Sequence, residues 1–146
     1  MLSNLARKED RADDEKQHLT DALAIDGDAF EPAGRLLMLG IVTADGKATK
    51  RALKRARAIA PLHPIALAGQ AIALKASGDS SRAKTLAQAA AKRLEGAEGP
   101  ADTFVVAALA AADTGSPSLA KALAKRALEL GGIPKAAKTR IATLAQ

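Results

Sequence analysis

Proline and glycine divide this chain into short segments, and that spacing restricts it to a fold of short helices. Prolines open segments at Pro64, Pro100, Pro117 and Pro134, and glycines close them at Gly46, Gly78, Gly115 and Gly131–Gly132. Proline is favoured in the first turn of a helix and glycine just beyond its end. Between these marks, apolar residues recur three and four positions apart, which is the helical period. We predict about eight helices, near residues 4–24, 30–44, 47–60, 64–77, 80–95, 100–114, 117–130 and 134–145.

The composition also favours an all-α chain. Hydrophobic residues make up 48% of the 146 residues, but only 1% are aromatic, namely Phe30 and Phe104. Strands favour β-branched and aromatic residues, whereas Ala, Leu, Lys and Arg favour helices. The length suits one domain over residues 1–146. The absence of Cys excludes disulfides, thiolate metal sites and a Cys nucleophile.

Three sequence features are predicted to start helices. Asp28 and Glu31 have the spacing of a capping box, and Asp79 and Ser116 are expected to be N-caps. Because the connections are only a few residues long, we expect neighbouring helices to run antiparallel.

A two-helix unit recurs along the chain. Gly78–Asp79 precedes Ala83 and Ala90, and Gly115–Ser116 precedes Ala120 and Ala127 at the same spacing. Apolar helices lie upstream of both glycines, and Leu36, Leu39–Gly40, Ala52 and Pro64 mark an earlier copy. A period in the mid-thirties with two helices per unit is typical of a helical solenoid.

This pattern resembles the tetratricopeptide repeat, with Ala in most of the family's aromatic positions. The resemblance implies a right-handed α-solenoid of antiparallel helix pairs. Its parts would be an acidic N-terminal helix or partial repeat over 1–28, repeats over 29–63, 64–99 and 100–132, and a capping helix over 133–146.

The resemblance also implies a concave groove that binds a partner peptide or helix. The positions expected to bind the partner are Leu37, Ile41, Ile65, Ile72, Lys75, Val105 and Leu109. This surface is mostly apolar, which suits a partner with an apolar helix face. Two other interpretations stay open: the acidic first helix folds into the groove, or these residues belong to the core.

No catalytic residue, metal site or cofactor is predicted. His18 and His63 lack the ligand spacing of a metal site. Asp26, Asp28 and Glu31 lack the other ligands of a calcium loop, and Gly78–Ser81 does not follow a strand as a nucleophile elbow would. We expect a non-enzymatic protein.

Charge is distributed unevenly along the chain. Residues 1–28 carry 4 Lys/Arg and 8 Asp/Glu, which is a net charge of −4. Since the whole chain has a net charge of +6, residues 29–146 carry +10. The densest basic cluster is Lys47, Lys50, Arg51, Lys54, Arg55 and Arg57. Lys and Arg residues near 84–93 and 121–126 would extend it into a basic outer face if the helices stacked. A solvated face is the favoured interpretation, followed by an acidic protein or the acidic first helix of another copy, and nucleic acid is the least favoured because aromatic residues for base stacking are missing.

The sequence therefore predicts an adaptor or scaffold subunit that binds another protein, either alone or within a larger complex. Binding of a polyanion through the basic face and self-assembly into a homo-oligomer are the alternatives. The N-terminus has no apolar leader and the sequence has no membrane span, so a cytoplasmic location is expected.

Overall fold

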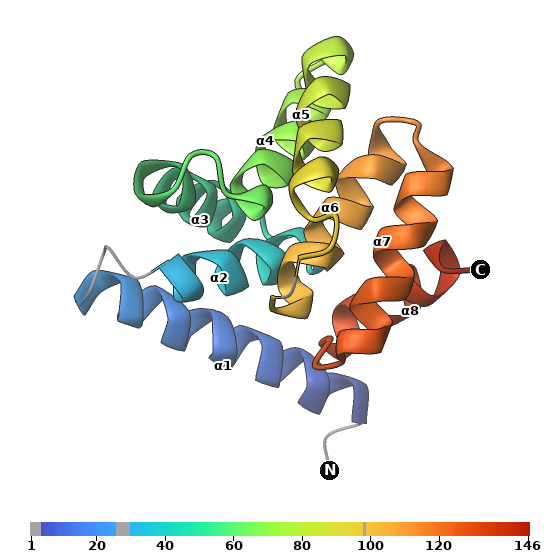
Figure 1. Ribbon diagram of the computed structural model, residues 1–146. Coiled ribbons are helices and arrows are strands. Elements are labelled where there is room, and N and C mark those ends of the chain that lie inside the picture. Colours follow the sequence, from blue (N-terminus) through green and yellow to red (C-terminus); the bar gives the residue numbers. More distant parts are fainter. Residues whose placement is uncertain (1–3, 26–29, 98) are drawn as a thin grey trace.

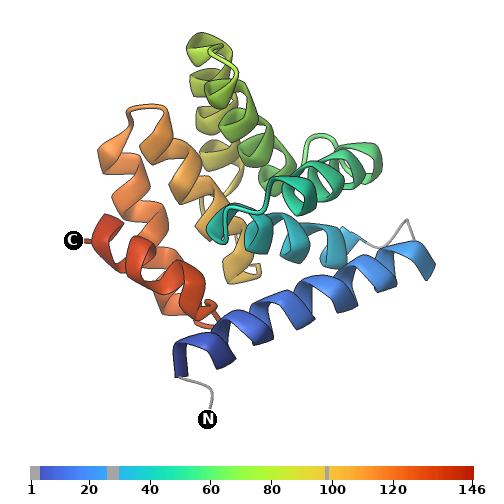
Figure 2. The same cartoon turned by 180° about the vertical axis from the view of Figure 1, so that it is seen from behind.

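The chain forms a bundle of helical hairpins flanked on one edge by its longest helix (Figures 1 and 2). This computed structural model describes residues 4–25, 30–97 and 99–146, with the backbone alone for residues 4–11. Within those ranges the elements are α1 (Asn4–Ile25), α2 (Phe30–Val42), α3 (Gly46–Ile59), α4 (Pro64–Ala76), α5 (Ser80–Arg93), α6 (Ala101–Asp113), α7 (Pro117–Leu130) and α8 (Lys135–Leu144). They include no strand, so the all-α prediction is confirmed for the described part of the chain.

Most of the predicted helix boundaries lie within one or two residues of the observed ones. Pro64 and Pro117 are the first residues of α4 and α7, as expected, whereas Pro100 and Pro134 lie one position earlier, at the N-caps. Asp79 caps α5 by accepting a hydrogen bond from the backbone N–H of Arg82, at 3.3 Å. Ser116 occupies the N-cap of α7 without a side-chain hydrogen bond. The capping box was predicted at Asp28, which lies outside the described residues.

The chain contains three helical hairpins, α2–α3, α4–α5 and α6–α7, and their turns share one geometry. Each turn has one residue with positive φ, namely Ala44 (55°), Gly78 (96°) and Gly115 (81°). The next residue donates its backbone N–H to a carbonyl five positions back, in Asp45 to Gly40, Asp79 to Leu74 and Ser116 to Ala111. This bond satisfies a carbonyl that the helix end would otherwise leave unpaired.

The prediction that Gly46 ends a helix is wrong. Gly46 begins α3, and Ala44 takes the left-handed conformation that Gly78 and Gly115 take in the later turns. The equivalent positions are 34 and 37 residues apart (44 to 78, and 78 to 115). The repeat is thus more regular in the structure than in the glycine pattern.

Helix α6 lies at the centre of the bundle (Figure 1). It packs extensively against α7 and α4, and also contacts α2, α5 and α8. Thr103 to Ala111 are all buried, because the small Ala side chains let neighbouring helices approach α6 from several sides. Helix α2 packs more closely on α6 than on α4. In a solenoid the first helices of successive repeats, α2 and α4, would pack side by side, so the right-handed solenoid stays a prediction. Each predicted repeat does contain one hairpin.

The core combines this alanine-rich helix with a few large side chains. Its largest fully buried residues are Leu36, Leu37, Met38, Leu39, Ile65, Val105, Val106, Leu109 and Ile141. None of the helices in the described ranges combines the length and the apolar content that crossing a bilayer would require.

Two glycines allow close helix contacts around the first hairpin. A Cβ at Gly40 in α2 would lie 2.6 Å from Thr49 Oγ1 and 2.8 Å from the backbone nitrogen of Thr49 in α3. A Cβ at Gly69 in α4 would lie 2.8 Å from Leu37 Cδ2. A side chain is tolerated less well at Gly40 than at Gly69, because the clash at Gly40 involves the backbone of α3 and not only a side chain.

His63 links the first two hairpins. Its Nδ1 accepts the backbone N–H of Ile65 at 3.2 Å and so caps α4. Its ring lies against Phe30 of α2, with 4.3 Å between the ring centroids. Burial lowers the pKa of His63, so the neutral ring that the cap requires is favoured.

Replacement of Gly40 by Ala should destabilise the fold. The new methyl group would force α3 away from α2, and overpacking of this kind costs about 1–3 kcal/mol. Gly46→Ala is the matched control, since nothing lies within 4 Å of a Cβ there. Thermal unfolding followed by circular dichroism should show a lower midpoint for Gly40→Ala only. Equal midpoints for the two variants would contradict the close crossing.

Stability should fall as the pH drops from 7.5 to 5. The lowered pKa means that folded His63 binds a proton less readily than the unfolded chain does. Its contribution is therefore present above about pH 6.5 and is lost as the pH falls through the lowered value. Chemical denaturation at several pH values should give a flatter profile for His63→Asn, which keeps a capping side chain. The same substitution at His18, which is exposed on α1, is the control.

Candidate functional site

Helix α1 is held on the edge of the bundle partly by a half-buried charge network. Arg35 of α2 donates from Nε to Glu15 of α1 at 2.7 Å and from Nη1 to Asp102 of α6 at 2.8 Å. Burial opposes the charge of Arg35, but the hydrogen bond to Glu15 and the attraction of Asp102 outweigh it, so the pKa of Arg35 is raised. One side chain thereby joins three helices.

A second polar contact fixes α1 beside the turn before α3. Lys16 Nζ lies 3.0 Å from Asp45 Oδ2 and 3.2 Å from both Thr43 Oγ1 and Asp13 Oδ1. The hydrogen bond from Lys16, together with the backbone N–H of Ala48, lowers the pKa of Asp45. Asp45 is also the N-cap of α3, so the same carboxylate starts α3 and binds α1.

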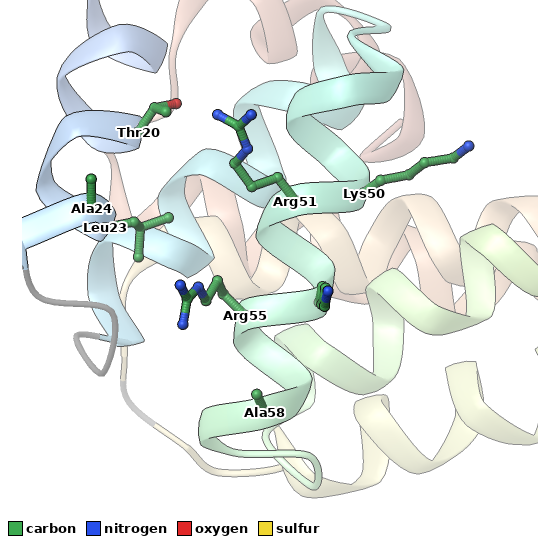
Figure 3. Close-up of a pocket in the computed structure, with 8 residues that line it drawn as sticks. Thr20, Leu23, Ala24, Lys50, Arg51, Arg55 and Ala58 are labelled. Atoms are coloured by element: carbon green, nitrogen blue, oxygen red, sulfur yellow. The ribbon is translucent and has the colours of Figure 1, made fainter.

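An open groove runs between α1 and α3 (Figure 3). It has a volume of about 740 Å³ and is lined by Thr20, Leu23, Ala24, Lys50, Arg51, Lys54, Arg55 and Ala58. In Figure 3, the side chains of Arg51 and Arg55 extend from α3 toward the side where Thr20 and Leu23 lie. Lys50 extends in another direction. One wall is therefore cationic, and the other is small and largely apolar.

The cations of α3 have no intramolecular counter-charge in the described part of the chain. Helix α3 carries six Lys and Arg residues and no acidic residue, and none of the six forms an ion pair there. Lys50 and Lys54, like Arg51 and Arg55, are one helical turn apart. Like charges at this spacing destabilise a helix by about 0.2–0.5 kcal/mol per pair. A bound anion would relieve that repulsion.

The predicted basic cluster is thus brought to one surface. Lys47, Lys50, Arg51, Lys54, Arg55 and Arg57 are all exposed on α3, and four of them line the groove. The stacking of α3, α5 and α7 that would extend this surface onto later helices is not observed, because α3 does not pack extensively on α5, nor α5 on α7, within the described ranges.

The predicted apolar groove is largely absent as an open surface. Leu37, Ile65, Val105 and Leu109 are at most 2% exposed. Their helices converge on α6, so these four side chains belong to the core, which is one of the interpretations that the sequence left open. Ile41 and Ile72 are half-buried against the core. Lys75 is exposed, and its Nζ lies 3.2 Å from Ser80 Oγ.

No arrangement for metal binding is found among the described residues. They contain no group of three or more His, Asp or Glu side chains that could hold an ion. His18 is exposed on α1, and His63 is engaged by α4 and Phe30. Every buried side-chain nitrogen and oxygen in the described part has a hydrogen-bond partner.

The sequence analysis missed the network around Arg35 and the groove itself. Arg35 is a single cation among apolar residues of α2, which is the one signal of a buried ion pair that the sequence contains. The groove has no such signal, since its two walls come from residues 20–24 and 50–58 and meet only through tertiary packing.

In comparisons with known proteins, no family model matched the chain, and neither a curated protein nor a solved structure matched it significantly.

Replacement of Arg35 by Met should loosen α1. The substitution leaves Glu15 and Asp102 without their cation, and Asp102 is only 17% exposed. Hydrogen bonds to charged groups contribute about 1.5–3 kcal/mol, so amides of residues 15–25 should exchange with solvent at least tenfold faster. Arg82→Met is the control, because its pair with Asp79 is exposed and lies within one helix turn. Unchanged exchange in α1 of the Arg35 variant would contradict the role of this network.

Proposed function

We propose that this protein is a non-enzymatic interaction module that binds an acidic protein segment through the groove between α1 and α3. The observation that carries the proposal is the cationic face of α3, where six Lys and Arg side chains have no carboxylate partner in the described part of the chain. Some other cations have such partners, in the pairs Lys16–Asp45, Arg35–Glu15, Arg82–Asp79 and Arg126–Glu129. Others, such as Lys84 and Lys125, also lack an ion pair in the described part, but no other described helix carries as many as six cations. The charge on α3 is therefore available to an external anion.

The apolar wall favours a peptide over a nucleic acid. Leu23, Ala24 and Ala58 supply small apolar contacts beside Arg51 and Arg55. Arginine forms paired hydrogen bonds with carboxylates, which suits Asp and Glu side chains. No aromatic side chain lines the groove, so bases would have nothing to stack on.

A role as an adaptor or scaffold agrees with the resemblance to tetratricopeptide repeats, which stays part of the proposal. The contact surface differs from the one that the family implies. It lies on the outer side of the first hairpin, rather than on a concave apolar surface.

Direct binding measurements can test the proposal. Fluorescence anisotropy of a labelled 20-residue polyglutamate should show saturable binding at low salt. Affinity should fall steeply by about 0.5 M salt, where the Debye length is only a few ångströms. Lys54→Glu combined with Arg55→Glu should weaken binding at least tenfold, because it reverses two charges of the groove.

The matched control has the same change in net charge at another place. Lys84→Glu combined with Lys125→Glu alters exposed residues of α5 and α7 and should leave affinity within about twofold. An equal loss in the control variant would mean that only net charge matters. Tighter binding of a labelled dT20 oligonucleotide than of polyglutamate at equal salt would overturn the choice of an acidic protein segment.

A further inference from the structure

We infer that the acidic segment bound by this surface is α1 of a second copy of the same chain, in a two-fold symmetric dimer. This inference rests on the proposed function and names its partner. The outer face of α1 carries the opposite charge to α3 and flanks the same groove.

The outer face of α1 is acidic and ends in an exposed apolar side chain. Asp14, His18, Asp21 and Ile25 are four, three and four residues apart and so lie on one face of the helix. All four are exposed, and Ile25 is 89% exposed. In the described part of the chain, Asp14 and Asp21 have no ion-pair partner, and Asp21 Oδ1 accepts a hydrogen bond only from Gln17, at 2.9 Å.

These carboxylates do not pair with α3 of their own chain. Helix α1 turns Leu19 and Leu23 toward the body, and Thr20 and Ala24 toward the groove. Asp14 and Asp21 lie on the opposite side from Leu19 and Leu23. An acidic helix face and a basic helix face are thus both exposed, on either side of one groove.

Such a surface is complementary to itself. A two-fold axis places residue A of one copy against residue B of the other, and B against A. The acidic face of each α1 then meets the basic face of the other α3, and both contacts form at once. Ile25 of the second copy supplies an apolar side chain for the region near Leu23 and Ala58.

The size of the surface sets the expected strength. Residues 14–25 and 47–58 each span about 18 Å of helix at 1.5 Å per residue. Two such faces give an interface at or below the low end of stable complexes, of which most bury about 1,200–2,000 Å². The dimer should therefore be weak, reversible and sensitive to salt.

Sedimentation equilibrium of the full chain, from about 1 µM to 1 mM and at several salt concentrations, tests the inference. At low salt the apparent mass should rise from 14.9 kDa to twice that value, and at about 0.5 M salt it should return to the monomer. Growth beyond the dimer would contradict the two-fold arrangement.

Two charge-reversed variants make the test specific. Asp14→Lys with Asp21→Lys reverses the acidic face, and the fourfold change of Lys50, Arg51, Lys54 and Arg55 to Glu reverses the charge of the basic face. Each variant alone should stay monomeric, because both contacts become repulsive. An equimolar mixture should dimerise, because both contacts are attractive again. Lys84→Glu with Lys125→Glu should dimerise like the unmodified chain, and circular dichroism checks that each variant is folded.

The outcome for the dimer can be separated from the outcome for the proposed function. The variant with the reversed acidic face keeps all the cations of α3 and should still bind polyglutamate. A protein that is monomeric at every concentration but binds polyglutamate would overturn the dimer and leave the proposed function intact. A protein that neither dimerises nor binds polyglutamate would overturn both. A mixture of the two variants that stays monomeric would also refute the paired helix faces.

Discussion

The burial of α6 is the constraint on which the rest of this structure depends. Its side chains from Thr103 to Ala111 are enclosed by helices of all three hairpins and by α8. Small alanine side chains make this possible, because they let several helices approach one axis. The result is a filled centre where an open array would have a concave surface. Leu37, Ile65 and Leu109 are buried there, so these side chains are not accessible to a partner.

Helix α1 is attached differently from the other helices. It packs on the edge of the bundle through Leu19 and Leu23 and through the ion pairs of Lys16 and Arg35. Glu15 of α1 forms an ion pair with Arg35 of the body, whereas Asp14 and Asp21 remain exposed on the outside. Helix α3, on the other side of the groove, keeps its cations exposed for the same reason: its apolar stripe of Ala52 and Ala56 faces inward. Charge separation on this surface thus follows from how each helix meets the core.

The local structure was largely predictable from the sequence, and the tertiary arrangement was not. Helix boundaries, the start of α4 at Pro64 and the cap at Asp79 depend on neighbours in sequence, so proline, glycine and aspartate mark them. Ala44 was missed because it occupies a position that glycine normally takes. The basic cluster was found on α3, since it lies within one helix. Its isolation from α5 and α7, and the groove with α1, depend on how the hairpins converge on α6, which no local pattern encodes.

The central claim is that the surface formed by α1 and α3 is where this protein binds, and chemical-shift mapping tests it most directly. Two-dimensional ¹H–¹⁵N spectra of the labelled protein would be recorded on dilution at low salt and again with added unlabelled polyglutamate. On dilution, we expect the changes to cluster in residues 13–25 and 47–58. With polyglutamate, we expect them in the residues that line the groove between α1 and α3. Changes centred on α5, α7 or α8, or spread evenly over the chain, would contradict it.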